Sequence, residues 1–158
     1  AVRFAEVQVD AGADTVGIGD AVASQLPPTL YEDTIAPREK VIVDAIHASG
    51  AWAKLHICGN ITHLLPGIAA LGIDILDVDH MVDMAAVRKA VGKRVVITGN
   101  VDPAAAVLQG TPGAIEQQIR RCCEAVGTPY MVNAGCEIPS GTPPENLRAL
   151  CRPQIPRD

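Results

Sequence analysis

Five short apolar runs alternate with segments of helical pattern, and this alternation limits the fold more than any other feature of the chain. The runs are flanked by turn residues and cover residues 14–19, 51–57, 73–79, 94–100 and 129–135. A strand followed by a helix, repeated along a chain, is the pattern of a parallel sheet covered by helices. The sequence therefore predicts an α/β fold built on one parallel sheet.

Capping residues followed by proline predict three helix starts in the second half of the chain. Asp102 and Thr111 each precede a proline, and Thr142 stands three residues before Glu145, which is capping-box spacing. We expect Asp102, Thr111 and Thr142 to be N-caps. The segment after Thr111 carries an apolar stripe, which predicts that its cysteine pair belongs to the core; the stripe consists of Ile115, Ile119, Cys122, Cys123 and Val126.

Polar side chains gather where the predicted strands end. They are Asp20, then His56 and Cys58, then Asp77, Asp79 and His80, then Asn100 and Asp102, and finally Cys136 and Glu137. Barrels of the (β/α)8 type build their active sites at this edge, whereas the glycine-rich phosphate loop of many doubly wound sheets is missing here. The sequence predicts a TIM-barrel-type fold. Such a barrel usually takes about 250 residues, so this chain would supply roughly the C-terminal five βα units.

Five βα units do not close a barrel, so two sheet edges would stay open. We expect residues 1–158 to form a single domain that is part of a longer barrel. The chain begins inside a helix-like segment, which also indicates a fragment. Self-association into a symmetric homodimer is a hypothesis for how the open edges are covered.

Composition excludes several classes of partner. The chain is 48% hydrophobic with a formal charge of −5, and its basic residues form no cluster, so we expect no nucleic-acid partner. We expect no membrane insertion either, because no apolar stretch approaches the length of a membrane span. The five cysteines lack the spacing of a disulfide framework, which favours a reducing cytoplasm where thiols are free to bind metal.

His56 and Cys58 form the first part of a predicted metal site. Residues i and i+2 of a strand face the same side, so both side chains can meet one ion, and Cys136 follows a later strand in a similar position. Imidazole and thiolate donors together favour Zn²⁺, and three protein ligands leave a fourth position for substrate. A short His-x-Cys motif also occurs by chance, so a buried histidine beside a buried thiol is the alternative.

Several segments, taken in order, resemble one protein family. They are "DAVASQLPPTLYEDTIAPREKVI", "LHICGN", "GIDILDVDHMVDMAAVRKAVG", "ITGNVDP" and "GCEIPSGTPPENLRAL". Together they are similar to the C-terminal half of the uroporphyrinogen decarboxylase superfamily, in its branch of zinc-dependent corrinoid methyltransferases. The decarboxylases proper lack the His-x-Cys motif, and a histidine-containing loop usually stands there in place of Gly135 and Cys136.

This resemblance implies an activity and its cofactors. It implies a (β/α)8 barrel in which His56, Cys58 and Cys136 bind zinc, and a methyl group passes from a methylated corrinoid protein to a small thiol such as coenzyme M. None of the four histidines stands in the D-x-H-x-x-G setting common in cobalt-binding modules, so we expect the methylcobamide on a partner protein.

Three further residues are candidate substrate contacts. By resemblance Asp20 lies at the barrel mouth, where it could orient a zinc ligand, face substrate or cap the next turn. Asn100 could contact substrate within the family's "GN-x-DP" element. Glu137 replaces an expected glycine, and its carboxylate could repel a sulfonate or offer a displaceable oxygen.

The remaining polar residues carry weaker expectations. Asp77 and Asp79 share a strand face and could hydrogen-bond His56, but solvated loop carboxylates are favoured. His63 and His80 are expected in packing or surface roles. Two other functions stay open, namely a metal-free decarboxylase-like lyase and a diverged half-barrel without turnover.

Overall fold

The computed structural model describes residues 1–152, and its five strands form one parallel sheet. The order in the sheet, β1-β2-β3-β4-β5, is also the order along the chain. Four strands lie within the runs predicted for them and β4 extends one residue beyond its run, which confirms the α/β prediction. The strands are β1 (Thr15–Gly19), β2 (Trp52–Ile57), β3 (Ile75–Val78), β4 (Val96–Val101) and β5 (Tyr130–Ala134).

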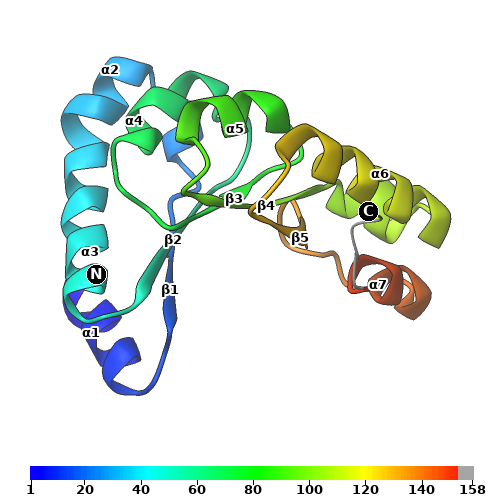
Figure 1. Cartoon of the computed structure of the whole chain (residues 1–158), viewed down its shortest axis with the longest axis horizontal. Helices are drawn as coiled ribbons and strands as arrows, with labels where there is room; N and C mark the ends of the chain where they lie inside the picture. Colours follow the sequence, from blue (N-terminus) through cyan, green and yellow to red (C-terminus); the bar gives the residue numbers. More distant parts are fainter. Residues whose placement is uncertain (153–158) are drawn as a thin grey trace.

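Helical segments connect consecutive strands, and Figure 1 shows helices α3 to α6 along the outer side of a curved sheet. The α-helices are α1 (Val2–Asp10), α2 (Pro28–Leu30), α3 (Ala36–Ala48), α4 (Leu65–Ala69), α5 (Met84–Val91), α6 (Pro112–Val126) and α7 (Pro144–Leu150). Short 3-10 segments are η1 (Ala23–Gln25) and η3 (Thr62–Leu64), and π-helical segments are η2 (Tyr31–Ile35) and η4 (Pro103–Leu108).

In strand β2, alternate side chains point toward the helix-covered core and toward the opposite face of the sheet, which we call the functional face. Its even-numbered side chains Trp52, Lys54 and His56 keep some solvent exposure. Its other three side chains are fully buried in the core cluster that also contains residues of α3 to α5; they are Ala53, Leu55 and Ile57. Neighbouring parallel strands place paired residues on the same face, so His56 shares its face with its partner Asp77.

The predicted helix starts are confirmed at two positions out of three. The Asp102 side chain accepts from the Ala104 and Ala105 N–H groups, and the Thr111 side chain accepts from the Ala114 N–H. The Thr142 prediction is wrong, because Pro143 precedes α7 and the Thr142 hydroxyl instead donates to the Pro139 carbonyl. The predicted stripe of α6 is buried, except that Cys123 is half-buried.

Residues 153–158, the last six of the predicted single domain, lie outside the described residues. Among residues 1–152, no helix is both long enough and apolar enough to cross a membrane. The single-domain boundaries and the homodimer stay predictions.

Candidate metal centre

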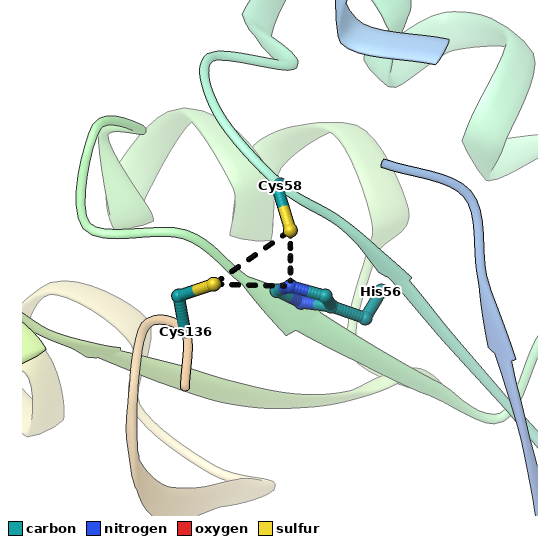
Figure 2. Close-up of side chains that lie close together, drawn as sticks. All are labelled: His56, Cys58 and Cys136. Atoms are coloured by element: carbon teal, nitrogen blue, oxygen red, sulfur yellow. Dashed lines mark hydrogen bonds between the residues drawn. The ribbon is translucent and has the colours of Figure 1, made fainter. Parts of the chain in front are cut away.

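Three side chains at the C-terminal ends of β2 and β5 converge on one point. Figure 2 shows His56, Cys58 and Cys136 directed toward one another. His56 Nε2 lies 3.2 Å from Cys58 Sγ and 3.9 Å from Cys136 Sγ, and the two sulfur atoms are 3.6 Å apart. All three side chains are half-buried. The structure thus brings together the set that the sequence singled out.

These separations suit a tetrahedral zinc site. Zinc bonds of roughly 2.3 Å to sulfur and roughly 2.0 Å to nitrogen place two sulfur ligands about 3.8 Å apart, and a sulfur and a nitrogen ligand about 3.5 Å apart. The sulfur–sulfur distance of 3.6 Å and the sulfur–nitrogen distances of 3.2 and 3.9 Å lie close to these values. Only small side-chain movements are needed to admit the ion, so the donor set fits zinc.

Two glycines make the convergence sterically feasible. Gly59, just after Cys58, turns the chain with a φ of +86°, and its N–H donates to Asp79 Oδ2 at 2.8 Å. Gly135, just before Cys136, packs so closely that a Cβ atom there would lie 2.4 Å from the His80 backbone nitrogen. Only glycine therefore allows the loop after β5 to approach the loop after β3 and bring Cys136 to the site.

The imidazole of His56 is held in a defined tautomer. Its Nδ1 lies 3.2 Å from the Asp77 carbonyl oxygen, which can only accept, so Nδ1 carries the proton. This leaves the Nε2 lone pair facing the two sulfur atoms. Ligating histidines in metalloproteins commonly have such a hydrogen bond on the second nitrogen.

Electrostatics disfavour a thiolate at Cys58 in the absence of a cation. Burial raises the pKa of the Cys58 thiol above its usual range, and the hydrogen bond with Cys136 and the charges of Cys136 and Asp79 raise it further. A divalent cation would reverse this preference because it stabilises the thiolate directly.

The three candidate substrate contacts lie outside the ligand cluster. The Asp20 N–H donates to the His56 carbonyl. Burial raises the pKa values of Tyr31 and Glu39, and the nearby Asp20 charge raises both further. Asn100 donates to the Asp79 and Val82 carbonyls and accepts from the Cys122 thiol. Its amide is bonded within the protein, so a substrate contact would have to replace one of these bonds.

Glu137, the third of these residues, is exposed directly after Cys136. Asn100 lines a hollow of about 380 Å³ with His80, Asp102 and Arg121, and none of the three candidate metal ligands lines it. The substrate roles of Asp20, Asn100 and Glu137 stay predictions.

The favoured expectation for Asp77 and Asp79 is wrong, because both are buried, at 7% and 5% exposed. Asp79 accepts from the Gly59 and Met81 N–H groups and pairs with His80, so it fixes the loops around the site. Asp77 pairs with Lys54 and lies beside His56. Lys54 was not predicted from the sequence, although its place two residues before His56 indicates a shared strand face. His63 and His80 are exposed, as expected.

Comparisons with known proteins agree with this fold. The family model for uroporphyrinogen decarboxylase (URO-D) matches residues 1–153. The chain is 35% identical over 154 residues to methylcobamide:CoM methyltransferase MtbA of Methanosarcina mazei, covering 94% of this chain and 44% of that protein. It is 36% identical over 153 residues to uroporphyrinogen decarboxylase of Parasynechococcus marenigrum, covering 95% of this chain and 43% of that protein.

The solved structure of a methyltransferase from Methanosarcina mazei matches with a TM-score of 0.85 at 28% identity, over 94% of this chain and 44% of that one. The predicted TIM-barrel-type fold is therefore confirmed, with this chain as a part of it. The chain spans less than half the length of these relatives. It belongs to the uroporphyrinogen decarboxylase family.

Proposed function

We propose that this chain carries the metal site of a zinc-dependent methyltransferase, which moves a methyl group from a methylated corrinoid protein to a thiol such as coenzyme M. The supporting observation is the convergence of His56, Cys58 and Cys136 at separations that suit zinc. The methyltransferase and decarboxylase relatives are about equally similar, at 35% and 36% identity. The ligand set, not the degree of identity, therefore favours the methyltransferase.

When bound, zinc supplies a positive charge that deprotonates a thiol and keeps its sulfur nucleophilic at neutral pH. The protein's part is to present two thiolates and one neutral imidazole, whose combined charge balances a divalent cation. His56 suits this role because the Asp77 carbonyl holds its proton on Nδ1. In the proposed reaction the acceptor sulfur bonds to the methyl carbon, the cobalt–carbon bond breaks, and its electron pair stays on cobalt as Co(I).

A metal-free lyase is the second candidate, and the 36% identity to a decarboxylase favours it. A half-barrel without turnover is the third, since the chain spans 44% of the methyltransferase relative. The methylated corrinoid protein, the small thiol and the cytoplasmic location remain parts of the proposal.

Metal content tests the proposal first. We expect about one zinc per chain, measured by plasma mass spectrometry on protein purified without chelator. Cys136→Ser should lose the metal, whereas Cys151→Ser, which replaces an exposed cysteine outside the cluster, should keep it. Zinc binding would then justify assaying thiol methylation from methylcobalamin. Wild-type protein without zinc after incubation with the ion would refute the methyltransferase proposal and favour the lyase.

A further inference from the structure

A partly buried charged network lies beside the candidate metal centre, on the functional face of the sheet. Lys54 Nζ is 2.7 Å from Asp77 Oδ2, and Asn133 Nδ2 is 3.4 Å from Asp77 Oδ1. The side chain of Asp77 is only 10% exposed, and that of Lys54 is 33% exposed. Both carboxylate oxygens of Asp77 thus bond to side chains from other strands.

The network joins the two strands that carry the metal ligands. Lys54 belongs to β2, two residues before His56, and Asn133 belongs to β5, three residues before Cys136. Asp77 lies on β3, between them in the sheet. A single carboxylate therefore connects the His56 strand with the Cys136 strand, although β4 also separates β3 from β5.

Asp77 also acts on His56 directly. Its carbonyl oxygen lies 3.2 Å from His56 Nδ1, and its carboxylate Oδ2 is 3.9 Å from the same nitrogen. Displacement of Asp77 would therefore disturb the orientation of one ligand as well as the separation of the two strands.

We propose that Asp77, held by Lys54 and Asn133, is a positioning residue that keeps the ligands of β2 and β5 at metal-binding separation. This proposal rests on the proposed zinc site. Hydrogen-bond partners of metal ligands typically contribute about 10–100-fold to metal affinity. The Asp77 carboxylate lies 3.9 Å from His56 Nδ1 and bonds to Asn133 on the strand before Cys136, so we expect its contribution to fall in this range.

A general contribution to stability must be distinguished from positioning, and Asp74 offers the matched control. It precedes β3, at the end of that strand away from the ligands, and its Oδ2 accepts from the Ala53 N–H and lies 2.8 Å from His47 Nε2. Like Asp77 it is a carboxylate that connects β3 with the preceding βα unit. We expect Asp74→Asn to lower the free energy of unfolding without changing the geometry of the candidate metal site.

The test measures zinc affinity of the 158-residue chain by competition with a chromophoric chelator, and stability of the metal-free chain by urea denaturation. We expect Asp77→Asn and Lys54→Met to weaken zinc binding about 10–100-fold, and Lys54→Arg to retain most of the affinity. Asp74→Asn should bind zinc like wild type. Bound Co²⁺ should show an altered thiolate charge-transfer band in Asp77→Asn but not in Asp74→Asn.

Other outcomes of these measurements would contradict the positioning role, or both the positioning role and the metal site. Wild-type affinity in Asp77→Asn, or an equal loss in Asp74→Asn, would overturn the positioning role and leave the metal site intact. If the wild-type chain itself bound no zinc, both the metal site and the positioning role would be refuted.

Discussion

Tyr31 and Glu39 form a buried pair whose members should not tolerate separate replacement. Tyr31 is fully buried and Glu39 is 4% exposed. The Tyr31 hydroxyl lies 2.5 Å from Glu39 Oε2, while Glu39 Oε1 is buried with no hydrogen-bond partner among the described residues. The single hydroxyl of Tyr31 is therefore the donor on which this carboxyl group depends.

The expected loss of stability follows from the different costs of removing one partner or both partners of a buried hydrogen bond. Tyr31→Phe leaves both carboxyl oxygens without a donor, and an unsatisfied buried polar group costs about 1–3 kcal/mol. Replacing both partners by apolar groups of similar shape can be nearly neutral or stabilising. We expect Tyr31→Phe to lower the free energy of unfolding by about 1–3 kcal/mol, and the double variant Tyr31→Phe/Glu39→Leu to be about as stable as wild type.

The cost of Tyr31→Phe should also depend on pH. Burial raises the pKa of Glu39, the Tyr31 hydrogen bond lowers it, and the charge of Asp20 raises it further. A raised folded pKa means that this contribution to stability is present below the unfolded value of about 4.3 and is lost as pH rises through the folded pKa. Loss of the Tyr31 donor raises the folded pKa further, so Tyr31→Phe should cost more near pH 8 than near pH 5.

Urea denaturation followed by circular dichroism measures these changes for wild type, both single variants and the double variant. Tyr130→Phe is the control, since Tyr130 donates to the Gly99 carbonyl and should show no coupling to Glu39→Leu. A Tyr31→Phe cost that is equal at both pH values, or a double variant less stable than Tyr31→Phe alone, would refute the reasoning.

Two further predictions concern the metal centre. Gly135→Ala should weaken zinc affinity in chelator competition, because the new Cβ would lie 2.4 Å from the His80 nitrogen and push Cys136 away; Gly113→Ala, with open space around it, should leave the affinity unchanged. Zinc affinity should rise with pH, because the raised pKa of Cys58 means that binding must displace its proton. Calorimetry in buffers of different ionisation enthalpy would detect that proton release, and an affinity independent of pH would contradict it.

The sequence predicted the strands, because β-branched and apolar runs flanked by turn residues leave few alternatives. It also predicted that His56, Cys58 and Cys136 converge, since His56 and Cys58 share a strand face and Cys136 follows a later strand. It could not predict the burial of Asp77 and Asp79, because strand-end carboxylates are usually solvated and the contact with Asn133 spans 56 residues of sequence. The error at Thr142 has a local cause, as Pro143 and not Thr142 precedes the helix.

All three candidate metal ligands come from the strands and loops of this chain, and this makes the zinc proposal testable without the rest of the barrel. His56 and Cys58 lie at the end of β2, and Cys136 follows β5, so the paired strands between them set their separation. Those strands pack against a core formed by this chain's own helices. The chain should therefore bind zinc by itself, while substrate binding and turnover depend also on whatever completes the barrel. We therefore expect an incomplete barrel to bind zinc without methylating a thiol. That result would be consistent with the proposed metal site.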